Sequence, residues 1–129
     1  MKTMRNIMLM ALAGLLAGCA SGPMKVFEGK ANQSLSAGVD AYNEGKYPDA
    51  VKNLQSALDQ GLSVGDQVKA RKYLAFTHCV SDKERLCREE FRKALDINPK
   101  LELEPAEVDH PTWGRVFREA KARKPDTRK

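Results

Sequence analysis

The sequence contains few of the residues that most often carry chemistry. Its 129 residues include three cysteines, two histidines and one tryptophan. There is no C-x-x-C pair, so a catalytic redox dithiol is not expected. The sequence also lacks a nucleophile elbow, a phosphate-binding loop and a paired zinc motif. These absences predict a protein that is not an enzyme and has neither a catalytic residue nor a metal site.

One apolar run stands near the N-terminus. Residues 7–17 are uncharged and almost wholly apolar, and a cationic start with Lys2 and Arg5 precedes them. About eleven residues are too few to span a bilayer as a helix, but they suit the core of a secretory signal. The run leads into Leu16-Ala17-Gly18-Cys19, which resembles the lipobox of bacterial lipoproteins. In that family a signal peptidase cuts before the cysteine, and the cysteine carries the lipid.

The lipobox resemblance implies a signal peptide over residues 1–18 and a covalent lipid on Cys19, with no other cofactor. The alternative is an ordinary signal peptide with a chance cysteine. Ala20 resembles the residues that allow sorting to the outer membrane, so we expect a lipid-anchored, periplasm-facing protein. Several acyl chains hold a membrane more firmly than one. The compartment would also permit disulfides.

The net charge of +5 falls to +3 when the two positive charges of the signal peptide are subtracted. Much of the excess lies at the C-terminus, in Lys121, Arg123, Lys124, Arg128 and Lys129. We interpret this tail as a solvated terminus. The alternative is contact with anionic lipid headgroups or cell-wall polymer. A nucleic-acid partner is not expected in this compartment.

The mature chain is predicted to be all-α, in four segments. A lipidated tether covers residues 19–30, because Ser21-Gly22-Pro23 is expected to break any local helix. Two helical repeats cover residues 31–99. An acidic linker and a capping helix cover residues 100–124, and a basic tail covers residues 125–129.

Local signals place the helices of the repeats. The first is expected from Ala31 to Asn43, and the second has Pro48 in its first turn and stops at Gly61. Ser63 with Asp66 predicts the start of the third helix, which should end near Cys79. A second capping box, Ser81 with Glu84, predicts the start of the fourth, and Asn98-Pro99 ends it.

The C-terminal part is expected to cap the array. The acidic side chains of residues 102–109, Glu102, Glu104, Glu107 and Asp109, are interpreted as a solvated loop, with a turn of helix at Pro105. A last helix opening at Pro111 carries Trp113, Val116, Phe117 and Ala120 on one face. We expect Trp113 to be core, with a partner-binding anchor as the alternative. His110 is expected to cap this helix.

Two copies of one pattern lie 37 residues apart between Ser34 and Pro99. The first is Gly38, Gly45, Tyr47, Ala50, Leu54, Ala57, Leu58; the second is Ala75, Asp82, Glu84, Cys87, Phe91, Ala94, Leu95. Small residues recur where two helices would cross. With the turn at residues 43–47 and the segment 91–99, the pattern resembles the tetratricopeptide repeat. This implies a short helix-turn-helix array of about two repeats with a C-terminal capping helix.

A narrower resemblance adds His78-Cys79, Cys87 and the run His110-Pro111-Thr112-Trp113-Gly114 to the lipobox and repeat. Together they resemble the TssQ-type lipoproteins associated with type VI secretion. This implies an accessory protein that binds a component of the secretion apparatus.

Cys79 and Cys87 form an even pair in an oxidising compartment, so we expect a disulfide between them. Such a short loop would add about 2–3 kcal/mol of stability. Two buried free thiols are the alternative. His78 and His110 do not have the spacing of paired zinc ligands, and structural roles are favoured for both.

The tetratricopeptide resemblance also implies a concave groove that binds a peptide or protein segment. By register the groove residues are Asn32, Leu35, Val39, Tyr42, Asn43, Lys69, Lys72 and Phe76. Apolar residues with two lysines suit a partner of some acidic character. The alternative is that Leu35, Val39 and Phe76 only pack against the tether or the last helix.

Three functions are therefore weighed. The first is a lipid-anchored interaction protein of the type VI apparatus. The second is a scaffold lipoprotein in envelope assembly that binds an outer-membrane assembly factor. The third is a peptidoglycan-associated regulator or minor enzyme, for which the basic tail is the single hint.

Overall fold

The computed structural model of the chain describes residues 22–123, and side chains from residue 29 onward. The predicted signal peptide over residues 1–18, the predicted lipid on Cys19 and the predicted tail over residues 125–129 lie outside the described residues. The described part is helical, with no strand. Its helices are α1 (Gly22–Asn43), α2 (Tyr47–Gln60), α3 (Val64–Val80), α4 (Glu84–Ile97), α5 (Pro105–Val108) and α6 (Gly114–Ala122).

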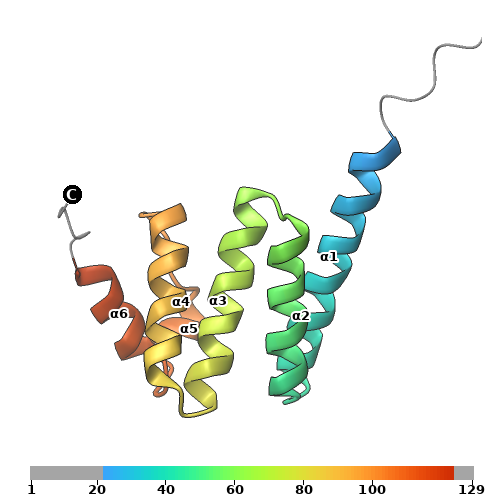
Figure 1. Cartoon of the computed structure of the whole chain (residues 1–129). Coiled ribbons are helices and arrows are strands. Elements are labelled where there is room, and N and C mark those ends of the chain that lie inside the picture. Colours follow the sequence, from blue (N-terminus) through green and yellow to red (C-terminus); the bar gives the residue numbers. More distant parts are fainter. Residues whose placement is uncertain (1–21, 124–129) are drawn as a thin grey trace, which may run out of the picture.

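The helices form two hairpins and a cap. α1 packs along α2, α3 packs along α4, and α2 and α1 also contact α3. α6 packs against α4, so Figure 1 shows α1 to α4 and α6 in succession across the molecule. This is the predicted all-α, tetratricopeptide-like array with a C-terminal capping helix. Among the described residues, no helix combines the length and apolar character needed to cross a bilayer.

Two apolar clusters hold the array together. The first core cluster joins α1, α2 and α3 through Ala31, Leu35, Leu54, Ala57, Leu62, Ala70 and Leu74. The second core cluster joins α3, α4, α6 and the segment between the last helices through Ala75, Phe76, Cys79, Cys87, Phe91, Leu103, Trp113, Val116, Phe117 and Ala120. The predicted small crossing positions Ala50, Ala57, Ala75 and Ala94 are fully buried. α6 therefore covers the apolar side of α4 that would otherwise be exposed to solvent.

Several helix boundaries agree with their predicted signals. Pro48 lies in the first turn of α2, and Gly61 ends that helix with a φ of 92°. The Ser63 hydroxyl accepts a hydrogen bond from the Asp66 N–H at 3.2 Å and caps α3. Each signal depends only on neighbouring residues, which is why the sequence alone reveals it.

Other boundaries were predicted wrongly. α1 begins at Gly22, not at Ala31, so much of the expected tether is helical. Pro23 is the second residue of this helix, where the N–H that proline lacks would have no helical partner. The Ser81 box does not form, because Ser81 closes α3 and Asp82 adopts a φ of 59° before α4 begins. The last helix starts at Gly114, after a turn at residues 111–113.

Candidate functional site

A shallow groove runs between α3 and the segment that follows α4. Its volume is about 420 Å³, and it is lined by Gly65, Val68, Lys69, Lys72, Tyr73, Leu101 and Glu104. We call it the α3 groove. Lys69 is exposed, whereas Val68 is buried. The lining thus includes apolar side chains and a basic wall formed by Lys69 and Lys72 of α3.

Lys72 is the most strongly held charge of the groove. Its ammonium donates to both carboxylate oxygens of Glu107, at 3.0 and 3.1 Å. The two side chains are only 13% and 16% exposed, so this ion pair is better shielded from water than most surface pairs. The ammonium also lies 5.7 Å from the ring centres of Tyr73 and Phe76, which adds a cation–π attraction.

An aromatic cluster continues from the groove toward the first repeat. Tyr42 of α1 packs edge-on against Tyr73 with ring centres 5.4 Å apart, and it also contacts Tyr47 and Phe76 at 6.1 Å. Burial, together with the neighbouring tyrosines and Glu107, raises the pKa of Tyr42 to about 12. Tyr42 therefore stays neutral at physiological pH and presents a hydroxyl group.

The predicted groove residues are not one continuous surface. Asn32, Asn43 and Lys69 are exposed, Val39 and Tyr42 are half-buried, and Lys72 is paired with Glu107. Leu35 and Phe76 were wrongly predicted as partner contacts. Leu35 is 5% exposed within the first core cluster, because α2 and α3 both pack on its side of α1. Phe76 is 2% exposed, because Trp113 stacks on it with ring centres 4.3 Å apart.

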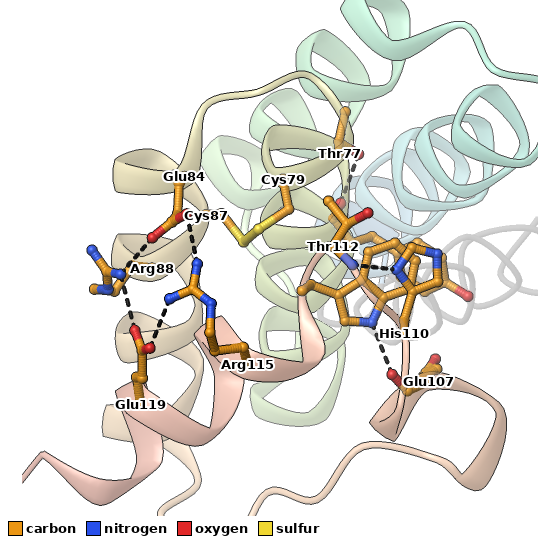
Figure 2. Close-up of a disulfide and its surroundings, with 12 residues drawn as sticks. Thr77, Cys79, Glu84, Cys87, Arg88, Glu107, His110, Thr112, Arg115 and Glu119 are labelled. Carbon is orange, nitrogen blue, oxygen red and sulfur yellow. Dashed lines mark hydrogen bonds and ion pairs between the residues drawn. A yellow bond between two sulfur atoms is a disulfide. The ribbon is translucent and has the colours of Figure 1, made fainter.

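The turn before α6 explains why Phe76 is covered. Trp113 is 5% exposed, and its Nε1 donates to the Glu107 carbonyl at 3.0 Å. His110 stacks on Trp113 at 3.4 Å, and its Nδ1 accepts from the Thr112 N–H. Gly114 follows without a side chain, since a Cβ there would lie 2.6 Å from the Val108 carbonyl oxygen. Figure 2 shows Glu107, His110 and Thr112 of this region near the disulfide.

A disulfide ties α3 to α4. Cys79 and Cys87 are bonded, with their Cα atoms 5.2 Å apart, and both are buried in the second core cluster. Four charged side chains, two on α4 and two on α6, lie together near the disulfide, as Figure 2 shows. Arg88 pairs with Glu84 and Glu119, and Arg115 pairs with the same two carboxylates. The pairs join α4 to α6 and lower the pKa of Glu119 through hydrogen bonds from Arg115 and Arg88.

Residues suited to metal or acid–base chemistry are dispersed. Within residues 22–123, no three histidine, cysteine, aspartate or glutamate side chains gather closely enough to hold a metal ion. His78 is buried between the helices of the second repeat, and this burial lowers its pKa. The groove therefore offers charge, hydroxyl groups and apolar area, which suit recognition of another chain.

The sequence did not predict that acidic side chains contribute to this site. Glu104 and Glu107 were expected in a solvated loop, but Glu107 is largely buried against α3. The two residues also form a capping box around Pro105, with the Glu107 carboxylate accepting from the Glu104 N–H at 3.0 Å. The Glu104-Pro105-x-Glu107 pattern was the available signal, because it fixes a helical turn and therefore the direction of Glu107.

The fold and the repeat define the chain as a short tetratricopeptide-like array. Its sequence is similar to photosystem I assembly protein Ycf3 of two Synechococcus strains, at 31% identity over 85 residues for strain CC9902 and 30% over 84 residues for strain CC9605. Each alignment covers 64% of this chain and 49% of the relative. The chain is also 28% identical over 60 residues to outer membrane protein assembly factor BamD of Haemophilus influenzae, covering 46% of this chain and 23% of BamD.

These relatives agree with the helical array but extend beyond it. Ycf3 and BamD both contain tetratricopeptide repeats. The chain spans about half the length of the Ycf3 relatives that it matches. No protein-family model matches the chain, and no solved structure matches it.

Proposed function

We propose that this chain is a non-catalytic, lipid-anchored interaction protein of the bacterial outer membrane, which holds a partner protein at the α3 groove and serves a type VI secretion apparatus. The observation that carries the interaction role is the groove itself. It combines the exposed Lys69, the half-buried Tyr73 and the apolar Val68 on one helix of a repeat array. The names of the relatives, which are assembly proteins, support the same general role.

The anchored location is supported by the lipobox Leu16-Ala17-Gly18-Cys19. The α1 helix begins at Gly22, so few residues separate the helical array from Cys19. An array held this close to a membrane would meet membrane-bound partners at high effective concentration, which offsets a shallow groove.

The secretion role is supported by the resemblance to the TssQ-type lipoproteins. Several residues that carry this resemblance hold the second repeat together or pack the cap onto it in this chain. Cys79 and Cys87 form the disulfide, and Trp113 stacks on Phe76 while Gly114 makes room for the Val108 carbonyl. The resemblance therefore describes a shared architecture, and the choice of partner depends on other residues.

Envelope assembly is the second candidate. The similarity to outer membrane protein assembly factor BamD favours it over the peptidoglycan hypothesis. The peptidoglycan hypothesis depends on the basic tail, which the structure does not describe beyond residue 123. Both candidates share the interaction role and differ in the partner.

A cross-linked affinity pull-down from cells separates these candidates, with Cys19→Ala as the control for anchoring. The proposal predicts membrane-complex or baseplate subunits of a type VI apparatus, recovered with the lipidated protein and lost with the variant. Recovery of outer-membrane assembly proteins instead would replace the secretion role by the second candidate. Absence of palmitate label from the wild-type chain would contradict the lipid anchor.

A further inference from the structure

The segment from Glu104 to His110, which we call the strap, lies over α3, and its main apolar contact with the core is the partly buried Val108. It contains α5, and none of the α5 residues is buried. Polar contacts hold it: the ion pair between Lys72 and Glu107, and hydrogen bonds from Trp113 and Arg118 to the Glu107 and Val108 carbonyls. The Glu107 side chain can therefore leave Lys72 without removing Val108 from the second core cluster.

The strap places a carboxylate on the basic wall of the α3 groove. Glu107 accepts two hydrogen bonds from Lys72, and the same carboxylate accepts from the Glu104 N–H. The structure thus shows which chemistry this helix face binds: a carboxylate on a short acidic segment. A partner segment with the same chemistry could make the same contacts.

The rest of the groove still offers charge and hydrogen-bond donors. Lys69 lies one helical turn from Lys72 on the same face of α3, is exposed, and has no ion pair within the described residues. The hydroxyl group of Tyr73, which also lines the groove, makes no hydrogen bond to another group of the described chain. A ligand with carboxylates and backbone carbonyls suits these groups.

We propose that Glu107 is a built-in occupant of the α3 groove, and that an acidic segment of the partner protein replaces it at Lys72 while a second carboxylate pairs with Lys69. This inference rests on the proposed interaction function and names the class of partner. Exchange of one carboxylate for another at Lys72 leaves no buried charge unpaired, so Glu107 can be replaced there without that penalty. The second contact, at Lys69, favours the partner over the strap.

The strap also reports its own position. Trp113 is the one tryptophan of the sequence, and its indole N–H is bonded to the Glu107 carbonyl. Displacement of the strap by a ligand should therefore change Trp113 fluorescence. The probe is an acetylated, amidated hexaglutamate peptide titrated into the full-length lipidated chain in neutral detergent, with hexalysine as the charge control.

The variants separate the strap from general electrostatics. Glu107→Gln removes the competing charge and keeps the backbone carbonyl, so hexaglutamate should bind roughly threefold to tenfold more tightly. Lys72→Gln should bind hexaglutamate about tenfold more weakly than Glu107→Gln does, because it lacks the ammonium that the peptide carboxylate would contact. Glu102→Gln is the matched control, because Glu102 pairs with Lys121 away from the groove. It should leave the affinity at the wild-type value.

Three results would overturn the inference: no fluorescence change with hexaglutamate, an equal change with hexalysine, or a Glu107→Gln affinity no higher than wild type. Circular dichroism of each variant establishes that it is folded, and backbone amide shifts of α3 give a second readout. Failure of the inference can be distinguished from failure of the proposed function, because a pull-down can recover a partner that binds without displacing Glu107. A strap that moves for hexaglutamate in a chain that recovers no partner would contradict the function and keep the inference.

Discussion

At the scale of single residues, Gly38 decides how closely α1 approaches α2. A Cβ built there would lie 2.6 Å from Leu54 Cγ and 3.1 Å from the Leu54 backbone nitrogen. Leu54 is fully buried in the first core cluster and has little room to move. Close packing of this kind penalises an added methyl group.

Gly38→Ala is therefore expected to lower the free energy of unfolding by about 1–3 kcal/mol. Gly29→Ala is the matched control in the same helix, because nothing lies within 4 Å of its built Cβ. The control should instead stabilise the chain by about 0.5–1 kcal/mol, since alanine favours a helix over glycine. Urea unfolding measures both, and equal effects of the two substitutions would refute the close approach.

His78 gives the second prediction at this scale. Burial lowers its pKa despite the opposing attraction of Glu90, so the unfolded chain takes up a proton at higher pH than the folded chain. Stability is therefore lost as pH falls through the unfolded value of about 6.5 toward the lowered folded one. His78→Gln should reduce this loss between pH 7.5 and pH 5.5, measured as the urea midpoint at both values. His110→Gln serves as the control, and a wild-type slope in His78→Gln would contradict the assignment.

At the scale of elements, the disulfide joins α3 to α4 across their turn. Replacing Cys79 and Cys87 together by alanine should lower the free energy of unfolding by about 2–3 kcal/mol, because the loop of the unfolded chain is no longer closed. Thermal unfolding of the oxidised wild type, the reduced wild type and the double variant provides the test. Reduction that leaves the wild-type melting temperature unchanged would show that the bond does not stabilise the fold.

The elements also show which parts of the fold were predictable. Signals confined to neighbouring residues, such as Ser63 with Asp66 and Gly61 at the end of α2, identified helix ends. Residues that can either start or end a helix gave wrong predictions of the helix ends. Ser81 looks like a start for α4, but its backbone N–H is bonded to the last carbonyls of α3. Pro23 looks like a helix breaker, but it begins α1.

The site was harder to predict than the fold. Periodicity assigned Leu35 and Phe76 to a face of their helices, and it cannot show what else in the chain covers that face. Trp113 reaches Phe76 from 37 positions later in the sequence, by way of a turn with no periodic pattern. Register assigned Lys69 and Lys72 to the same helix face, and both line the α3 groove. The acid that pairs with Lys72 comes from the strap, whose fold depends on contacts distant in sequence.

At the scale of the whole molecule, two repeats are fewer than such arrays usually need to stand alone. Here the cap supplies the rest. α6 brings Val116, Phe117 and Ala120 into the second core cluster, and Arg115 and Glu119 pair with α4 at its edge. The cap and the strap come from one C-terminal segment, so the part that completes the fold also occupies the groove.

The central claim is that a partner protein binds at the α3 groove. Site-specific photo-cross-linking in cells tests it most directly, with the reactive amino acid placed at Lys69 in the groove or at Lys52 on the exposed face of α2. The account predicts a discrete cross-linked protein from position 69 that is absent from position 52. Cross-links that form equally from both positions, or from position 52 alone, would contradict a partner site at the groove.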